Sequence, residues 1–433
     1  MQFEAAQRGK IRVNIPPVYC IGCEACRQRC KHGSITMSPN TKGFLYPIHN
    51  PEACLACHAC ENVCPMQEKR LRERDYSMRE GVEVECYVVS IKDSAEIARS
   101  TSCGVSYLLS KATINEGGVV FGAAFGRDWL PHHTSASTLE ELETFRGSKY
   151  IASELGDSFE RVKGFLRAGQ RVLFSGTPCQ ISALKSYLKI DYGNLLTVSI
   201  VCHGVGSPIA WYRYLDEQLL SLGITRSDIS RIEFRDQCPS GRICLSIYTV
   251  DTEVPFWSEE HQVNDYMRAY GRDYILRDEC YSCNFKLHAS SADVIIGDYW
   301  GGAAHIDKLE GRKSTIILLS EKGRRIFDSL KLDARRVDLP SLIAGNYPLL
   351  YSAPKTSRVD YFFKNLGKMP FSLLVNKTDR FDFLRYCRDR IRHNRRVGGR
   401  GAYCRTILHS LYLFLPVRYR ISLRSFVKKI LFR

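Results

Sequence analysis

Residues 20–30 read CIGCEACRQRC and place four cysteines within eleven positions. The same spacing, C-x2-C-x2-C-x3-C, recurs in CLACHACENVC at residues 54–64, where Pro65 follows. In bacterial two-cluster proteins with this doubled run, each half gives three thiolates to one [4Fe-4S] cluster and its last cysteine to the other. We therefore assign Cys20, Cys23, Cys26 and Cys64 to the first cluster, and Cys54, Cys57, Cys60 and Cys30 to the second.

Zinc and disulfide bonds are the alternatives for so many thiols. Structural zinc sites favour two cysteine pairs separated by a longer gap, which two matching quartets fit poorly. Lys31 stands where the first quartet would usually be followed by proline, and this departure costs no ligand. A ferredoxin-type module of this kind transfers single electrons, so we expect the rest of the chain to hold a two-electron centre.

The composition is that of a folded chain without a secretory or membrane-spanning segment. Eighteen cysteines occur in 433 residues, of which 44% are hydrophobic, and the length predicts two or three domains. The opening MQFEAAQRGKIRVNIPP lacks the apolar core of a signal peptide, and no run of about 18 apolar residues predicts a membrane helix. We therefore expect a cytoplasmic chain whose thiols bind metal more often than they form disulfides.

Strand and helix patterns alternate from about residue 84 onward. Apolar runs such as GGVVFGAAF, RVLFSG and NLLTVSIV alternate with helical patterns such as DSFERVKGFLRAGQ, and ISRIEFRD with RICLSIYTV is expected to form a hairpin. This alternation predicts a mixed α/β fold with a mostly parallel sheet. The expected parts are a ferredoxin-type domain at 1–70, a linker at 71–83, a large α/β region at 84–350 and a basic helical extension at 351–433.

A second group of cysteines follows the predicted strands. In RVLFSGTPCQISALK a buried strand runs into a Gly-Thr-Pro turn, and a helix begins near Cys179. Free N–H groups there favour an anion, a flavin pyrophosphate or a thiolate-bound cluster, and an ordinary tight turn has the same pattern. Cys202 ends the next strand, and Cys280 and Cys283 form another C-x2-C pair. These four can hold a third [4Fe-4S] cluster; structural zinc and separate buried thiols are the alternatives. The isolated cysteines are expected to pack as small apolar residues: Cys86, Cys238, Cys244, Cys387 and Cys404.

Several longer pieces carry a family resemblance. They are TSCGVSYLLSKATINEGGVVFGAAF, RGSKYIASELGDSFERVKGFL, VLFSGTPCQISALK, VCHGVGSP, DECYSCNF and DVIIGDYWGG, which follow the ferredoxin-type run in order up to about residue 305. With these pieces the chain resembles the coenzyme F(420) hydrogenase/dehydrogenase beta-subunit family. The resemblance implies an iron-sulfur flavoprotein that binds FAD and passes electrons between a substrate and its clusters. A plant relative reduces a chlorophyll derivative, so the fold does not fix the substrate.

The resemblance also implies which residues hold the flavin in the 84–350 region. These are Ser102, Gly104, Ser148, Lys149, Gly176, Thr177 and Pro178. Glycines admit the flavin and its phosphates, hydroxyl groups hydrogen-bond to their oxygens, and a lysine offsets phosphate charge. The sequence departs from the family at Cys103-Gly104, where a double glycine is usual, and nothing in it indicates a pocket for F(420) itself.

Four further side chains are candidates for acid-base or binding roles. His132 and His133 in WLPHHTS, His203 in CHG and Asp298 in GDYWGG stand near predicted strand ends, where α/β proteins bind ligands. The histidines are as well explained as surface or hydrogen-bonded structural residues, and Asp298 as a turn cap. No G-x-G-x-x-G follows a strand, so a nicotinamide site has no support.

The basic charge is concentrated in the last segment. Residues 380–433 contain 15 Arg and Lys and two acids, within a chain whose net charge is +16. Such a tail can lie on an anionic membrane surface at the inner face of the membrane, pack on its own domain, or bind nucleic acid, although no recognised nucleic-acid motif accompanies it. Some bacterial relatives resemble accessory enzymes of surface-polysaccharide synthesis, which a membrane-surface position suits.

Two functions from different classes follow. The first is a flavin- and iron-sulfur-dependent oxidoreductase, in which FAD exchanges two electrons with an organic substrate and the clusters relay them singly. The second is a non-catalytic electron-transfer subunit that couples a partner enzyme to a ferredoxin pool. In both cases the expected partner is ferredoxin or another redox protein.

Overall fold

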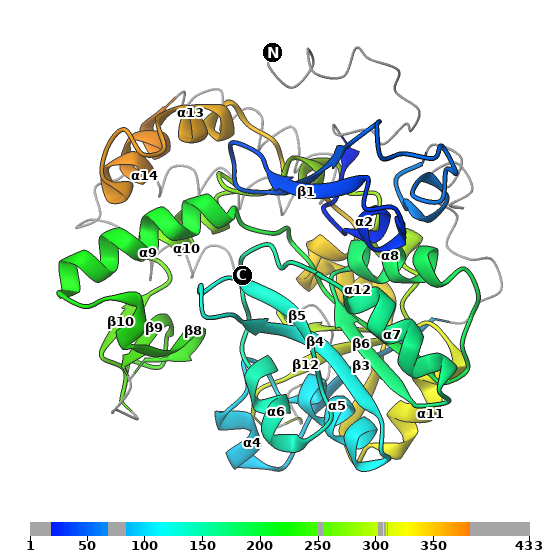
Figure 1. The fold of residues 1–433 in the computed structure, drawn as a ribbon. Coiled ribbons are helices and arrows are strands. Elements are labelled where there is room, and N and C mark those ends of the chain that lie inside the picture. The colour runs from blue at the N-terminus through cyan, green and yellow to red at the C-terminus, as the bar shows by residue number, and fades with distance from the viewer. Residues whose placement is uncertain are drawn as a thin grey trace.

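A computed structural model describes residues 19–67, 84–238, 240–249, 254–301, 306, 309 and 311–381 (Figure 1). The linker at 71–83 and the basic segment after residue 381, which contains Cys387 and Cys404, lie outside the described residues. Among the described helices, none combines the length and the apolar composition that a bilayer crossing requires.

The larger part of the molecule is built on one eight-stranded sheet in the order β13-β3-β12-β11-β7-β6-β4-β5. The pairs β4–β6, β6–β7 and β7–β11 are parallel, and the other pairs are antiparallel. The α/β prediction is confirmed. The expectation of a mostly parallel sheet is wrong, because four of the seven strand pairs are antiparallel and only the central strands β11, β7, β6 and β4 run parallel. The strands are β3 (Glu85–Ser90), β4 (Val119–Phe125), β5 (Pro131–Ala136), β6 (Val172–Gly176), β7 (Leu195–Ile200), β11 (Val294–Asp298), β12 (Ser314–Leu318) and β13 (Asp333–Val337).

Helices cover both faces of this sheet because successive strand residues point to opposite sides. On one face, Phe121 and Phe174 pack against α7 (Ser158–Arg167), α8 (Pro178–Leu188) and α12 (Leu339–Gly345). The other face buries the alternate residues, such as Val120 and Leu173. That face is covered by α5 (Val105–Asn115), α6 (Leu139–Leu142), η3 (Glu143–Phe145) and α11 (Glu321–Ser329), and α4 (Ser94–Ala98) precedes α5 in the chain. The carboxyl ends of β4, β6, β7 and β11 meet at one edge, called the carboxyl edge below.

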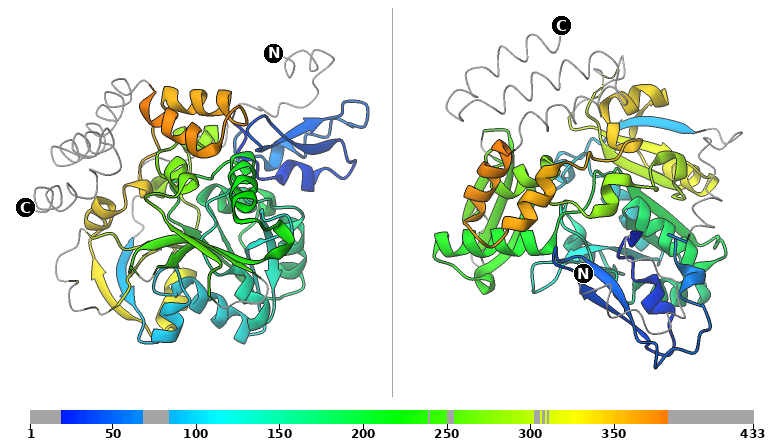
Figure 2. Two further views of the ribbon diagram at one scale, coloured as in Figure 1. Left: turned by 90° about the vertical axis from the view of Figure 1, so that its left-hand side faces the viewer. Right: turned by 90° about the horizontal axis from the view of Figure 1, so that it is seen from above.

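A smaller body has a separate aromatic core around Trp211, Phe234 and Tyr266. Its antiparallel sheet is β8 (Ile229–Gln237), β9 (Ile243–Thr249) and β10 (Trp257–Glu260), and its helices are α9 (Pro208–Leu222), η4 (Arg226–Asp228) and α10 (Asp265–Gly271). The predicted β8–β9 hairpin is confirmed. Helices α13 (Ser357–Asn365) and α14 (Phe371–Arg380) also pack into this core, although they belong to the expected extension (Figure 2).

One prediction about isolated cysteines is wrong. Cys238 and Cys244 are joined by a disulfide bond and are not separate packing residues. The β8–β9 turn, in which the Cys238 N–H donates to the Arg242 carbonyl at 2.9 Å, brings the Cα atoms of the two cysteines to 5.9 Å, although Cys244 lies opposite Asp236 in the register. Cys86 is buried, as expected.

The N-terminal part is a small ferredoxin-like unit that packs against α7 and α8. Its hairpin is β1 (Ile35–Pro39) with β2 (Leu45–His49), and its helical turns are α2 (Ala25–Arg29) and η2 (Glu61–Val63). The smaller body and the eight-stranded sheet are connected by segments that contain the short turns η5 (Asp278–Ser282), η6 (Leu287–Ala289) and η7 (Tyr347–Leu349).

Candidate functional site

The first predicted quartet gathers around one cavity. Cys20, Cys23, Cys26 and Cys64 all line a hollow with about 370 Å³ of unfilled space, together with Ile21 and Met66. Burial, followed by the neighbouring Cys64, Cys26 and Cys20 thiols, raises the pKa of Cys23. Thiols packed this closely favour a multivalent cation, because only a bound positive charge compensates several buried thiolates. Cys64 joins the three cysteines of the other run, as the crossed pattern predicts.

Three members of the second quartet also pack together. Cys54 and Cys60 are buried in one cluster with Ile35, and Cys30 packs against it. Burial raises the pKa of Cys60 to about 11. Cys57, the fourth member, is exposed to solvent, so the second cluster would lie nearer the surface than the first.

The two cysteine runs have the same backbone conformation at matching positions. Gly22 and Glu24 in the first run have φ of 68° and 56°, and Ala56 and His58 at the matching places have 53° and 54°. The N–H of Gly22 and of Ala56 each donates to a cysteine Sγ at 3.4 Å. Left-handed backbone is costly for residues other than glycine. Its repetition therefore indicates that each run is wound to direct N–H groups at its sulfurs.

A second cavity collects the four remaining candidate thiols. Cys179, Cys202, Cys280 and Cys283 line a hollow with about 650 Å³ of unfilled space. They come from the start of α8, the end of β7 and η5, and burial followed by the charges of Cys202, Cys283 and Cys179 raises the pKa of Cys280. Burial raises the pKa of Cys179 to about 11 and that of Cys202 to about 12. Within the described residues, no three or more His, Cys, Asp or Glu side chains are spaced to hold a single metal ion.

The two cavities are neighbours. Ile21 and Met66 line both of them, and Arg277, which lines the second, donates to the Cys20 carbonyl at 2.8 and 2.6 Å and to the Leu45 carbonyl at 3.0 Å. Despite burial, which opposes its charge, nearby Cys20, Tyr46 and Glu279 hold the pKa of Arg277 above its usual range. Residues 20–45 are therefore fixed to the wall of the second cavity.

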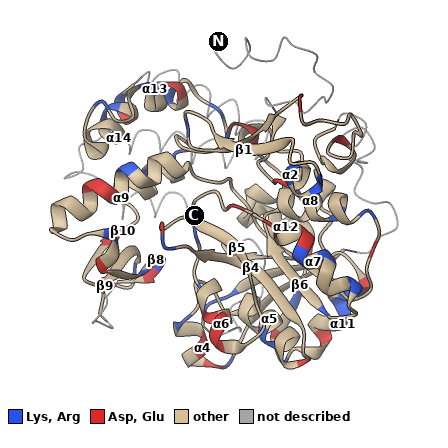
Figure 3. Ribbon diagram, in the orientation of Figure 1, with Lys and Arg blue, Asp and Glu red and all other residues tan. Residues whose placement is uncertain are grey.

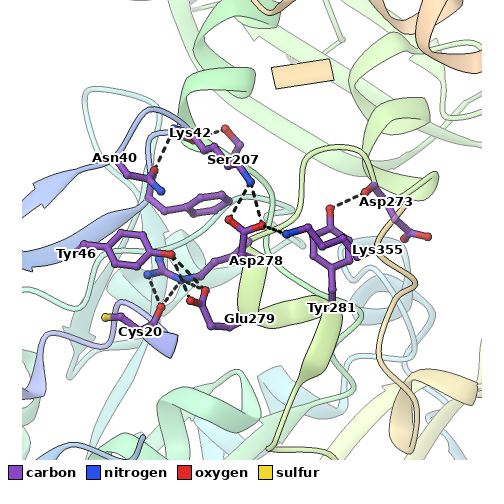
Figure 4. A network of polar contacts seen from close by, with 12 residues as sticks. Cys20, Asn40, Lys42, Tyr46, Ser207, Asp273, Asp278, Glu279, Tyr281 and Lys355 are labelled. Atoms are coloured by element: carbon purple, nitrogen blue, oxygen red, sulfur yellow. Dashed lines mark hydrogen bonds and ion pairs between the residues drawn. The ribbon is translucent and has the colours of Figure 1, made fainter. Parts of the chain in front are cut away.

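Further polar contacts join the ferredoxin-like unit to the wall of the second cavity, and we call this contact region the junction (Figure 4). Tyr46 donates to Glu279 at 3.3 Å, and Lys42 pairs with Asp278 at 2.8 Å, where Lys355 joins at 2.9 Å. The ferredoxin-like unit is thus held to η5, the turn that carries Cys280.

The residues that the resemblance implies for the flavin lie around the carboxyl edge, and the structure brings them together in part. The Ser102 hydroxyl lies 2.8 Å from that of Ser314, the residue opposite Asp298 in the sheet. Gly104 precedes α5 with a φ of 86°, and a Cβ there would meet the Glu96 side chain at 3.1 Å. Gly176 ends β6, Thr177 Oγ1 lies 3.1 Å from Cys179 Sγ, and Pro178 lines the second cavity.

Lys149 and His133 lie at this edge, and burial lowers the pKa of both side chains. Lys149 Nζ donates to the Arg146 carbonyl at 2.9 Å, and burial lowers its pKa to about 8. His133 is buried, with its pKa lowered to about 4, mainly by burial. Its Nε2 donates to the Ser175 carbonyl at 3.1 Å, while Nδ1 has no hydrogen-bond partner among the described residues. A neutral ring protonated at Nε2 leaves Nδ1 as an acceptor.

Asp298 is part of an ion pair. It pairs with Arg235, which also hydrogen-bonds Tyr150, a residue that contacts Ser148. The Tyr150 ring lies 4.8 Å from that of Tyr270, whose hydroxyl donates to the Gly204 carbonyl at 2.8 Å in the wall of the second cavity. An aromatic pair therefore joins the Asp298 region to the four thiols.

The other two histidines differ from His133. His132 is partly exposed and lies 3.1 Å from Asp128 and 3.6 Å from Glu154, which makes it a surface ion-pair residue. His203 lines the second cavity, with Nε2 2.6 Å from the buried carboxylate of Asp273.

Comparison with known families agrees with these features. Residues 169–339 match the family model that describes the carboxyl terminus of the coenzyme F(420) hydrogenase/dehydrogenase beta subunit, and residues 19–67 match the 4Fe-4S dicluster domain. Residues 169–339 belong to that beta-subunit family. The resemblance is confirmed, and this beta-subunit homologue is an iron-sulfur redox protein.

Two curated relatives and one solved structure are similar to parts of the homologue. The F subunit of F(420)H(2) dehydrogenase from Methanosarcina mazei is 24% identical over 42% of this chain and 53% of its own length. The B subunit of the ion-translocating oxidoreductase complex from Methanosarcina acetivorans is 37% identical over 15% of this chain and 23% of its own length. The chain thus spans about half of the first relative and about a quarter of the second. A chain of the F(420)-reducing [NiFe] hydrogenase complex of Methanosarcina barkeri, 18% identical, covers 68% of this chain and 90% of its own, with a TM-score of 0.40.

Sequence reasoning missed Arg277, Arg235 and Tyr150. Arg277 stands three positions before Cys280, and a cation beside a predicted thiolate ligand is a usable signal. The Arg235–Asp298 pair has no local signal, because its partners are 63 residues apart.

Proposed function

We propose that the chain is an iron-sulfur flavoprotein oxidoreductase. Two [4Fe-4S] clusters in residues 19–67, and a third on Cys179, Cys202, Cys280 and Cys283, relay single electrons between a redox protein and FAD at the carboxyl edge. The observation that carries this proposal is that both cysteine-lined cavities are lined by Ile21 and Met66. Redox groups bound in these two cavities would be separated by the width of a few side chains and not by a whole domain.

The surroundings of the second cavity support a cluster with net negative charge. Lys286 Nζ donates to the Cys202 carbonyl at 2.9 Å, and Arg277 is buried in the same wall. Four thiolates around an iron-sulfur cube carry excess negative charge, which fixed cations stabilise, and such outer groups tune cluster potentials. The donor set therefore fits a cluster.

Polar groups at the carboxyl edge support the binding of FAD there. The residues that would hold it are Ser102, Gly104, Ser148, Lys149, Gly176, Thr177 and Pro178. His133 Nδ1 is a buried acceptor without a partner among the described residues, and Lys149 is a cation whose Nζ donates to backbone carbonyls. When bound, FAD exchanges electrons in pairs with a substrate and singly with a cluster. Lys149 supplies positive charge, and the His133 ring keeps its proton at Nε2.

The second candidate function is an electron-transfer subunit without its own organic substrate. It is favoured by the names of the two curated relatives, each a subunit of a larger redox enzyme. A role as accessory enzyme in surface-polysaccharide synthesis and a peripheral membrane position stay predictions.

A turnover experiment separates the two functions. The chain is purified anaerobically, its FAD is quantified, and the dithionite-reduced protein is mixed with a panel of organic acceptors or with an oxidised ferredoxin. The oxidoreductase proposal expects bound FAD and reoxidation by an organic acceptor. Loss of electrons to the ferredoxin alone, in a preparation without flavin, contradicts it and supports the electron-transfer role.

A further inference from the structure

A cationic surface lies beside the second ferredoxin-type quartet. It consists of Arg29, Lys31, Lys163, Arg167 and Lys189, here called the basic surface. Arg29 and Lys31 flank Cys30, a predicted ligand of the second cluster, whereas the others come from α7 and the end of α8. Figure 3 shows Lys and Arg on α2 and α7, which pack against each other.

The five cations lie close enough to affect one another. After burial, the charges of Arg167, Arg29, Lys189 and Lys31 lower the pKa of Lys163. The Tyr187 ring contacts two of them, with the Arg29 guanidinium 5.7 Å and the Lys163 ammonium 5.9 Å from its centroid. One tyrosine therefore links the cations of the ferredoxin-like unit to those of the sheet helices.

This concentration of charge lacks compensation within the described residues. None of the five side chains forms a salt bridge with a described carboxylate, and Glu160 is the acid whose charge reaches Tyr187. Lys31, Arg167 and Lys189 are exposed, and Ile190, beside Lys189, is 62% exposed. An uncompensated positive field around an apolar spot fits a negatively charged protein surface.

The position of the basic surface indicates what kind of protein binds there. Cys57 of the second quartet is exposed, and Leu55 beside it is 68% exposed, so the second cluster is the one nearest to solvent. No cysteine of the first quartet or of the second cavity is exposed, and Ile21 and Met66 line both cavities. Electrons that enter from a carrier therefore have their shortest route through the quartet that the basic surface flanks.

We propose that the basic surface is the docking site of a small acidic one-electron carrier protein of the ferredoxin or flavodoxin class. This inference rests on the proposed function and adds where the carrier binds. The reduced carrier gives one electron to the oxidised second cluster, so the carrier is oxidised and the cluster is reduced, with no bond made or broken. Opposite charges steer the encounter and raise the association rate.

The test is the rate at which a reduced acidic [2Fe-2S] ferredoxin reduces the full-length chain, followed by stopped-flow absorbance at several ionic strengths. The test variant is Arg167→Glu/Lys189→Glu. The control variant is Arg325→Glu/Lys331→Glu, exposed cations on or just after α11, which covers the opposite face of the sheet. Both variants make the same change in net charge.

We expect the test variant to react about tenfold more slowly than wild type at low salt, and the control to change less than twofold. The difference should shrink at about 1 M salt, where charges are screened beyond about 3 Å. Equal rates for test variant and wild type at low salt, or equal slowing of the control, overturn the proposal. So does variant-specific loss of binding to anionic vesicles or to DNA without a change in the carrier rate. Reduction by dithionite separates this failure from failure of the proposed function, because a chain that holds neither clusters nor FAD shows no bleaching with either reductant.

Discussion

Arg277 donates two hydrogen bonds to the backbone carbonyl of Cys20, a residue 257 positions earlier in the chain. It also pairs with the buried Glu279 at 3.1 Å, and its guanidinium lies 4.5 Å from the centre of the Tyr46 ring. One buried cation thus joins a predicted ligand of the first cluster to the turn that carries Cys280.

Removal of this cation should destabilise the junction. Arg277→Ala leaves Glu279 buried without its ion-pair partner, which typically costs about 3–5 kcal/mol. Urea unfolding followed by tryptophan fluorescence measures this loss. Lys355→Ala is the control, because Lys355 is half exposed and pairs with Asp278 at the surface, where about 0–1 kcal/mol is expected. Equal, small losses in both variants contradict the role given to Arg277.

Lys149 is expected to contribute to flavin binding. Lys149→Met removes a cation that would offset phosphate or flavin charge, and a charge-assisted hydrogen bond of about 1.5–3 kcal/mol corresponds to at least a tenfold weaker affinity for FAD. FAD released from the denatured protein is quantified by fluorescence, and iron in the same sample should not change. Lys111→Met on the exposed face of α5 serves as the control. Full FAD content in Lys149→Met rejects this assignment.

The buried neutral His133 predicts a loss of stability in weak acid. Its pKa in the folded protein is about 4, against 6.5 for an ordinary histidine. The unfolded chain therefore binds more protons below pH 6.5, and the stability present above pH 6.5 is lost as the pH falls toward 4. Between pH 7 and pH 5 wild type should lose about 2 kcal/mol more than His133→Asn. His132→Asn is the comparison variant, because His132 is partly exposed; the same pH dependence in His133→Asn and wild type contradicts the prediction.

Two glycines should respond to alanine in opposite directions. At Gly206 an added Cβ would lie 2.3 Å from the Tyr150 carbonyl, whereas at Gly164 in α7 nothing lies within 4 Å. Gly206→Ala should cost about 1–3 kcal/mol through displacement of the Tyr150 segment, and Gly164→Ala should stabilise by about 0.5–1 kcal/mol. Thermal unfolding of both variants checks the contrast. An unchanged Gly206→Ala would show that the Tyr150 segment moves freely.

Local patterns predicted the parts of this fold that depend on local chemistry. The position of Cys64 beside Cys20, Cys23 and Cys26 around one cavity followed from cysteine spacing, and the β6–α8 turn with Cys179 followed from an apolar run ending in Gly-Thr-Pro. These succeed because ligand spacing and turn chemistry are properties of a few adjacent residues.

Long-range pairing was beyond such patterns. β3 pairs with β12 and β13, far from β4, the next strand in sequence, and apolar alternation does not encode which strand is the neighbour. Likewise Phe371 and Leu374 enter the core around Trp211, although their segment reads as part of a basic extension. The hydrogen bonds of Arg277 to Cys20 and the disulfide bond of Cys238 to Cys244 form because the folded chain brings these residues together.

Iron analysis of anaerobically purified, reconstituted protein tests the continuous relay most directly. Each [4Fe-4S] cluster contributes four irons, so wild type should contain about twelve irons per chain, Cys280→Ser about eight, and Cys86→Ala, which changes a buried thiol of β3, about twelve. About eight irons in wild type, unchanged in Cys280→Ser, would contradict a cluster on the second cavity and break the proposed path to the carboxyl edge.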